Sequence, residues 1–150
     1  MINKILVAVD GSSHSLKAVE CAAEIAVGCN AKMLILSVIK AHQAPKVSQE
    51  LQAYAKLEHI QGADFQVVEM LSNQLLSHAE ATAHDKGIAD VETKLATGPV
   101  ARTIVGTAKE QNIDLIVIGS RGLGNIEATL RGGVSHRVEL LAACSVLTVK

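Results

Sequence analysis

Residues 5–28 read ILVAVDGSSHSLKAVECAAEIAVG, a continuous apolar run followed by a polar turn and an amphipathic stretch. The run Ile5–Val9 is typical of a parallel strand that is covered on both faces. From Ser13 to Gly28 apolar residues recur at helical spacing, and Ser12 or Ser13 is suited to cap the helix. The predicted apolar stripe of this helix comprises Leu16, Val19, Ala23, Ala26 and Val27. A strand that leads directly into a helix predicts the opening of an α/β fold.

The same alternation continues to the end of the 150-residue chain. Further apolar runs, which predict four more strands, span Met33–Ile39, Ile88–Ala96, Leu115–Ile118 and Val146–Val149. Helical patterns span Asp64–Gly87 and Val134–Ala142, and Pro99 suits the first position of another helix. Strand alternating with helix predicts one α/β domain over residues 1–150 with a mainly parallel sheet. The run Ile88–Ala96 alternates apolar and polar residues, which favours an edge strand with one wetter face.

The longest predicted helix, Asp64–Gly87, follows a segment that does not fit the alternation. The apolar stripe of this helix is predicted to comprise Phe65, Val68, Leu71, Leu75, Ala79 and Ala83. Gly87 is expected to end it in the left-handed conformation. The preceding residues 40–62 contain Pro45 and the amphipathic sequence SQELQAYAKLEHIQ, which predict a short extra helix at the carboxyl edge of the sheet. Two interpretations of this segment stay open: a solvated excursion, or a lid or partner-binding surface.

Composition excludes several classes of protein. Apolar residues make up 49% of the chain and charged residues 19%, which is typical of a globular domain and not of a disordered one. The chain has 14 Lys and Arg residues against 15 Asp and Glu residues. Its aromatic residues are one tyrosine, Tyr54, and one phenylalanine, Phe65, and it has no tryptophan. A chain with a formal charge of -1 and no aromatic stacking platform is not expected to bind nucleic acid.

Targeting features and cysteines favour the cytoplasm. The N-terminal sequence MINKILVAVDGS lacks the basic region, long apolar core and cleavage site of a signal peptide. No apolar run approaches the roughly 20 residues that span a membrane. Cys21, Cys29 and Cys144 are odd in number and form no CxxC pair. We expect them to be buried free thiols, as in a reducing cytosol, and the protein to be soluble and cytoplasmic.

Ligands of open α/β sheets bind beyond the carboxyl ends of the strands, so residues at those ends are candidates for a site. The first predicted strand ends in Asp10-Gly11-Ser12-Ser13, and the dinucleotide fingerprint GxGxxG is absent from that turn. The chain contains no Walker loop either. Two interpretations of Asp10 stay open. It caps the following helix, or its carboxylate points into the crevice and accepts ribose hydroxyls or holds a cation beside phosphates.

A second candidate feature follows the predicted strand Leu115–Ile118. The chain reads GSRGLG over residues 119–124, and Gly132 and Gly133 precede the last predicted helix, whose first turn contains Ser135. Glycines let backbone N–H groups approach an anion, and a helix N-terminus adds unpaired donors with positive partial charge. The pattern favours a phosphate site, with a purely geometric role of the glycines as the alternative.

These segments together resemble the universal stress proteins over nearly the whole chain. The resemblance rests on the sequences ILVAVDGS, LILSVI, GPVARTIV, DLIVIGSRGLG and SVLTVK. Its most specific part is the motif Gly-x2-Gly-x9-Gly-Ser/Thr of the ATP-binding branch, which Gly119, Gly122 and Gly132 match in spacing. The resemblance implies an open, five-stranded, flavodoxin-like (Rossmann-like) parallel sheet in the order 3-2-1-4-5 with helices on both faces. It also implies a homodimer through the C-terminal strand that binds ATP or a related adenine nucleotide with Mg2+ or Mn2+.

The resemblance assigns roles to particular residues. Asp10 would lie near the ribose and the metal–phosphate region, and the backbone around Val38 would meet the adenine. The phosphates would be lined by Gly119, Gly122, Gly132, Gly133, Val134 and Ser135. Arg121 would screen phosphate charge, with a solvated loop arginine as the alternative.

Gly133 is the one departure from the motif, which has Ser or Thr at this position. The backbone N–H is kept, but a hydroxyl is lost. Because one hydrogen bond to a phosphate is missing, ATP is expected to bind more weakly by roughly 2- to 100-fold. Ser135 is available to compensate in part.

The expected function is that of a stress-response protein that binds an adenine nucleotide as a regulatory dimer. Two alternatives stay open. One is a slow nucleotide phosphohydrolase in which Asp10 holds the metal and Arg121 neutralises charge. Efficient hydrolysis is not predicted, because no base or water-positioning residue is evident beyond Asp10. The other is a nucleotide-free dimer that works through protein partners, which Gly133 favours.

The remaining polar candidates carry less weight. The six histidines are scattered and form no HExxH pattern, so we expect surface or capping roles for them. His136 stands out only because it adjoins Ser135. Asp114 begins a predicted strand, which puts it at the wrong end of the sheet for catalysis.

Overall fold

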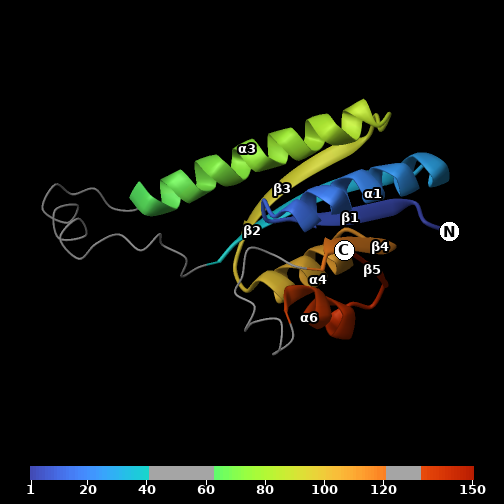
Figure 1. Ribbon diagram of the computed structural model, residues 1–150. Coiled ribbons are helices and arrows are strands. Elements are labelled where there is room, and N and C mark those ends of the chain that lie inside the picture. The colour runs from blue at the N-terminus through green and yellow to red at the C-terminus, as the bar shows by residue number, and fades with distance from the viewer. Residues whose placement is uncertain (41–62, 121–132) are drawn as a thin grey trace, which may run out of the picture.

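The computed structural model describes residues 1–40, 63–120 and 133–150. Its elements are β1 (Lys4–Val9), α1 (Ser13–Cys29), β2 (Lys32–Ile39), α3 (Ala63–Asp85), β3 (Val91–Thr97), α4 (Val100–Glu110), β4 (Leu115–Gly119), α6 (Val134–Leu141) and β5 (Ser145–Val149). The strands are parallel and lie in the order β3-β2-β1-β4-β5 (Figure 1). The predicted α/β fold class and strand order are therefore confirmed.

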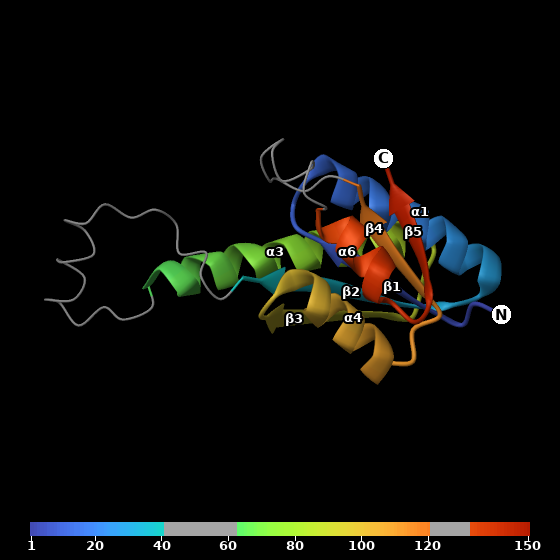
Figure 2. The same cartoon turned by 90° about the horizontal axis from the view of Figure 1, so that it is seen from below.

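Helices cover both faces of the sheet, as Figure 2 also shows. Helices α1 and α3 lie on one face, and α4 and α6 lie on the other. In the central strand β1, Ile5, Val7 and Val9 belong to the apolar cluster under α1 and α3. Leu6 and Ala8 belong to the cluster under α4 and α6. Burial on both faces explains why this strand is a continuous apolar run.

Helix α1 packs on the sheet through its small residues. Ser12 caps it, because the Ser12 hydroxyl accepts a hydrogen bond from the backbone N–H of Ser15 at 3.2 Å. The buried stripe comprises Ser15, Ala18, Val19, Ala22, Ala23 and Ala26. The expected stripe is wrong at two positions, since Val27 is 52% exposed and Leu16 is only half-buried. The alanine face is the flattest side of the helix, and it allows the closest approach to the strands.

Helix α3 extends beyond the sheet, which corrects the expected burial of its first half. A helix of 23 residues is about 35 Å long, whereas the eight residues of β2 span about 26 Å. Figure 1 shows the N-terminal end of α3 passing the end of β2. Phe65 is 45% exposed and Leu71 is 54% exposed, while Leu76 and Ala79 are buried. Although α3 is long, no helix in the described ranges is apolar enough over sufficient length to cross a membrane.

Two predicted element boundaries are also corrected. The third strand begins at Val91 and not at Ile88, because Ile88 is buried in the turn after α3, where its N–H donates to the carbonyl of Ala83. Gly87 in this turn has a φ of +98°, the left-handed conformation that was expected of it. Pro99 is the N-cap of α4 and not its first helical residue, since its backbone is extended.

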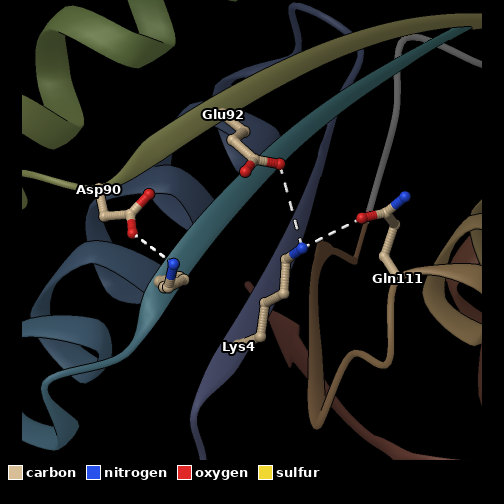
Figure 3. Close-up of polar contacts among 5 residues, drawn as sticks. Lys4, Asp90, Glu92 and Gln111 are labelled. Atoms are coloured by element: carbon tan, nitrogen blue, oxygen red, sulfur yellow. Dashed lines mark hydrogen bonds and ion pairs between the residues drawn. The ribbon is translucent and has the colours of Figure 1, made fainter.

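Charged side chains at the amino edge of the sheet pair with one another (Figure 3). The Nζ of Lys4 donates to Oε1 of Gln111 at 3.1 Å and lies 4.0 Å from Oε2 of Glu92. Lys32 Nζ lies 2.9 Å from Oδ2 of Asp90. These contacts connect β1, β2 and the residues around β3 and α4 at this edge.

Asp114 contributes to the same edge through backbone contacts. Its Oδ2 accepts hydrogen bonds from the N–H groups of Asn3 at 2.8 Å and Lys4 at 3.0 Å. Both bonds favour the charged carboxylate and lower the pKa of Asp114. Asp114 therefore joins the start of β4 to the start of β1, at the opposite edge from the candidate site, as the sequence predicts.

The three cysteines are free thiols, as expected, but their burial differs from the expectation. Cys21 and Cys144 are half-buried, and Cys29 is exposed. Cys29 is the last residue of α1, where Asn30 takes a left-handed conformation and turns the chain toward β2. The end of the helix thus leaves this thiol in solvent.

Candidate functional site

Two helix starts meet the carboxyl end of β4 at Ser120. On one side, Nδ1 of His14 in the first turn of α1 lies 2.9 Å from Oγ of Ser120. On the other side, Oγ of Ser135 in the first turn of α6 donates to the carbonyl oxygen of Ser120 at 3.5 Å. The N–H of Ser120 donates to the carbonyl of Val149 at 2.7 Å, which continues the pairing of β4 with β5. We call this place, the end of β4 with the first turns of α1 and α6, the β4 site.

Gly119, the last residue of β4, lies against the first turn of α1. A Cβ at this position would be 2.8 Å from the carbonyl carbon of His14 and 2.8 Å from the nitrogen of Ser15. Real Cβ atoms do not approach the backbone so closely, so only glycine is accommodated here without a shift. Gly119, a site residue predicted from the sequence, therefore lies at the β4 site. Its close packing against α1 by itself explains why this position is a glycine.

Asp10 follows β1 and is held at the start of α1. Its Oδ1 accepts a hydrogen bond from the N–H of Ser12 at 2.9 Å, and its own N–H donates to Oγ of Ser15 at 3.3 Å. The residue is nevertheless exposed. The two interpretations of Asp10 are thus compatible, because Oδ1 stabilises the turn while the carboxylate stays accessible to a ligand or cation.

The start of α6 is uncapped by any side chain of the described residues. Gly133 is its N-cap, with a φ of -61° and a ψ of 179°, and makes no side-chain capping bond. Val134 and Ser135 form the first turn and are half-buried. The first N–H groups of a helix have no intrahelical partner, so this turn offers donors and positive partial charge to an anion.

Of the remaining predicted site residues, the structure describes Val38, and the others lie outside the described residues. Val38 lies near the end of β2, opposite Ala96 of β3, and packs on the apolar cluster under α4 and α6. Its backbone lies at the same carboxyl edge as Asp10 and Gly119, since the strands are parallel. Outside the described residues lie Arg121, Gly122, Gly132 and the segment 41–62.

His14 and Ser120 are the residues of the β4 site that sequence reasoning missed. They are separated by 106 positions, so no local spacing connects them. The available signal was the position of each residue: His14 is in the first turn after β1, and Ser120 directly follows β4. Turns after neighbouring parallel strands lie at one edge, which brings such residues together.

The described residues hold no cluster of three or more His, Cys, Asp or Glu side chains that could bind a metal ion by themselves. At the carboxyl edge, Asp10 presents an exposed carboxylate in the turn between β1 and α1. Mg2+ commonly takes one or two carboxylates and completes its shell with water and phosphate oxygens.

A separate groove of about 390 Å³ runs between β3 and α4. Lys94, Arg102 and Glu110 are among its lining residues, and it includes none of the predicted site residues. The β4 site and this groove are thus two distinct features of the molecule.

The fold and the β4 site define a class of protein: an open, flavodoxin-like α/β sheet whose candidate ligand site lies between two helix starts at the carboxyl end of an interior strand. The family model described as "Universal stress protein family" matches residues 1–150. The chain belongs to the universal stress protein family.

Curated relatives and solved structures agree with this assignment. The chain is 36% identical to the universal stress protein YxiE of Bacillus subtilis over 151 residues, with 100% of each chain covered. A solved universal stress protein in complex with cAMP is 27% identical, with a TM-score of 0.71 and coverage of 99% of this chain and 97% of the other. The hypothetical protein MJ0577 is 22% identical, with a TM-score of 0.80 and coverage of 100% and 96%, and supports the fold.

Proposed function

We propose that this chain binds an adenine nucleotide, with ATP among its ligands, at the β4 site and acts as a nucleotide-dependent regulatory dimer in the cytoplasm. The observation that carries the proposal is the convergence of α1 and α6 on Ser120. The ligand class is supported by the related universal stress protein that was solved in complex with cAMP, an adenine nucleotide.

The two helix starts differ in what they offer a phosphate. In α1, the Ser12 hydroxyl already accepts the N–H of Ser15. In α6, the N-cap Gly133 makes no such bond among the described residues. Because the uncapped start has more unpaired donors, we expect the phosphate on the side of α6, next to Val134 and Ser135.

We expect ATP to bind together with a divalent cation because of the carboxylate of Asp10. A polyphosphate next to an exposed carboxylate experiences repulsion between like charges, which a bridging Mg2+ or Mn2+ removes. We therefore expect ATP to bind with the cation, held by Asp10 directly or through water. A singly charged phosphodiester such as cAMP has much less need of it.

A nucleotide-free mode of action through protein partners is the second candidate function. Gly133 favours it, because the N-cap lacks the hydroxyl that the ATP-binding motif provides at this position. This candidate predicts that neither the dimer nor the thermal stability responds to ATP.

The first experiment denatures freshly purified protein and identifies released small molecules by chromatography and mass spectrometry. A near-stoichiometric adenine nucleotide supports the proposal. Calorimetric titrations with Mg–ATP, with cAMP and with Mg–GTP then establish affinity and the preference for adenine. No saturable binding of any of them at millimolar concentration contradicts nucleotide binding and favours the nucleotide-free candidate. Release of phosphate that is linear in protein concentration and lost in Asp10→Ala favours the phosphohydrolase instead.

The dimer in this proposal uses the edge strand β5. An edge strand has one row of unpaired backbone groups, and a second copy can pair with them. In α6, which leads into β5, Leu140 is 71% exposed and Leu141 is 53% exposed. A partner molecule on this edge would cover apolar surface as well as backbone.

Sedimentation equilibrium tests the dimer and its location. The wild-type chain is expected to be dimeric, and Val146→Pro in β5 to be monomeric, because proline has no N–H to donate. Thr93→Pro in the opposite edge strand β3 is the matched control and should stay dimeric, with circular dichroism to verify that both variants are folded. A dimeric, folded Val146→Pro would contradict pairing through β5.

A further inference from the structure

We propose that His14 is a phosphate-recognition residue of the β4 site, so that anion binding there strengthens as His14 takes up a proton. The inference rests on the proposed nucleotide function. It adds to that function a residue outside the glycine motif, and it predicts how affinity responds to pH.

The position of the His14 ring is fixed from both ends. Its backbone is in the first turn of α1, where Gly119 packs against it, and its Nδ1 lies 2.9 Å from Oγ of Ser120. The ring therefore spans from α1 to the end of β4. Among the described residues Nε2 has no hydrogen-bond partner, and we assign this second nitrogen to the ligand.

The contact with Ser120 lets Nε2 act as a hydrogen-bond donor in both the neutral and the protonated form of the ring. A serine hydroxyl both donates and accepts. When it donates to Nδ1, the neutral ring carries its proton on Nε2. When the ring is protonated, Ser120 accepts from Nδ1 and Nε2 donates with a full positive charge, which makes the stronger hydrogen bond to a phosphate oxygen.

The charged groups around His14 determine how the binding of a proton to the ring and the binding of an anion to the β4 site affect each other. The charged or titratable side chains of the described turns, helices and chain end around His14 are Asp10, Lys17, Glu20, Glu24, His136, Arg137, Glu139 and Lys150, and the C-terminal carboxylate of Lys150 lies at the same chain end. None of the ion pairs among the described residues involves His14, whether with an Asp, a Glu or the terminal carboxylate, and Asp10 already accepts the N–H of Ser12. Among the described residues the charged form of the ring therefore has no anionic partner within ion-pair distance, and a bound phosphate would supply one.

The sign of the pH dependence follows by linkage. A phosphate favours the protonated ring, and by reciprocity the protonated ring favours the phosphate. Histidine is the side chain that normally changes charge between about pH 5 and pH 8. Affinity is therefore expected to rise as the pH falls through that interval, with uptake of up to one proton per bound ligand.

The experiment is calorimetric titration with cAMP at about pH 5.5, 6.5 and 8, the interval in which histidine titrates. The probe is cAMP because its phosphodiester has no second proton, unlike a terminal phosphate, which loses one near about pH 6. Binding of cAMP to the wild-type chain should be about 10-fold tighter at the lowest pH than at the highest, the gain of one charge-assisted hydrogen bond. Repeating the titration in buffers of different ionisation enthalpy should show proton uptake.

Variants separate His14 from other titrating groups. His14→Gln keeps a neutral donor near Nε2 and should bind cAMP with little pH dependence, while His14→Asn keeps a group near Nδ1 and should bind more weakly throughout. His136→Gln in α6 and His84→Gln in α3 should retain the wild-type pH dependence. His84 is a matched control, since its Nδ1 also has a partner, the carbonyl of Ile88 at 2.7 Å, but far from the site.

The outcomes distinguish this inference from the function on which it rests. If cAMP binds with the same affinity at every pH, or His14→Gln keeps the wild-type dependence, the role of His14 is refuted and nucleotide binding stands. Loss of the dependence in His136→Gln alone would transfer the role to that residue and refute it for His14. If neither cAMP nor Mg–ATP binds at any pH, the nucleotide function itself is refuted, and the role of His14 with it.

Discussion

Gly119 and His14 are in backbone contact so close that a single methyl group at position 119 would lie 2.8 Å from the carbonyl carbon of His14. This contact sets the distance between the end of β4 and the first turn of α1. Ser120, the next residue, uses that proximity for its hydrogen bond to the His14 ring. Gly119 therefore positions the start of α1 relative to the end of β4.

Replacement of Gly119 by alanine should destabilise the fold and weaken nucleotide binding together. The added Cβ must displace α1 or β4, and overpacking of this kind costs about 1–3 kcal/mol. Gly106→Ala is the matched control, because a Cβ at position 106 in α4 meets no atom within 4 Å. Alanine in a helix interior is favoured over glycine by roughly 0.5–1 kcal/mol, so this variant should be more stable. Urea denaturation of both variants checks the two signs, and a neutral Gly119→Ala would show that the contact relaxes freely.

Replacement of Gly133 by serine should strengthen nucleotide binding. A Cβ here meets no atom of the described residues within 4 Å, and the extended backbone at the N-cap suits serine. The added hydroxyl is expected to tighten Mg–ATP by roughly 2- to 100-fold, the value of one hydrogen bond to phosphate. Calorimetric titration measures the change. Gly133→Ala, which adds the Cβ without the hydroxyl, should show no gain, and an equal gain in both variants would rule out the hydroxyl as its cause.

The fold could be predicted because its signals are local. The continuous apolar runs of β1 and β4 and the cap at Ser12 each depend on a few adjacent residues. The burial of α3 depends instead on where the sheet ends relative to the helix, and no periodicity contains that information. Phe65 and Leu71 therefore match the stripe in sequence and are exposed in the structure.

Some residues of the candidate site could likewise be located from the sequence, and others could not. Asp10, Gly119 and Ser135 could be located because turns between parallel strands and helices share one edge. The contact between His14 and Ser120 could not, since it depends on how closely α1 approaches β4, and Gly119 sets that distance through long-range packing. Local sequence thus identified the edge but not the side chains that meet across it.

Asp10→Asn should separate metal-dependent from metal-independent ligands. The amide can still accept the N–H of Ser12, so the turn before α1 is expected to persist. It has no charge with which to attract a cation, and Mg–ATP should bind about 10-fold more weakly, while cAMP binds as well as before or better. Titrations with and without Mg2+ measure both ligands. Equal weakening of the two would indicate a disturbed turn and contradict a role in holding the cation.

Asp114 should make stability fall in acid. The hydrogen bonds from Asn3 and Lys4 lower the pKa of its carboxyl in the folded state. A lowered folded-state pKa gives stabilisation that is present above the ordinary value of about 3.9 and is lost as the pH falls below it. Asp114→Asn should be less stable at neutral pH and should lose less stability between about pH 5 and pH 3. Urea midpoints across this range provide the test, with Asp85→Asn at the end of α3 as an exposed control, and parallel curves for wild type and Asp114→Asn would contradict the assignment.

The three thiols should react in an order set by burial. Cys29 is exposed, and it should react first with an aromatic disulfide reagent at neutral pH. Cys144 should react more slowly, because burial raises the pKa of its thiol and leaves less of the reactive thiolate. Stopped-flow traces of the folded protein should lose the fast phase in Cys29→Ser. Cys144→Ser should keep the fast phase and lose only part of the slow amplitude, because Cys21 is half-buried as well. A fast phase that survives in Cys29→Ser would place the accessible thiol elsewhere, whereas loss of the difference between phases in urea is expected, since unfolding exposes all three cysteines equally.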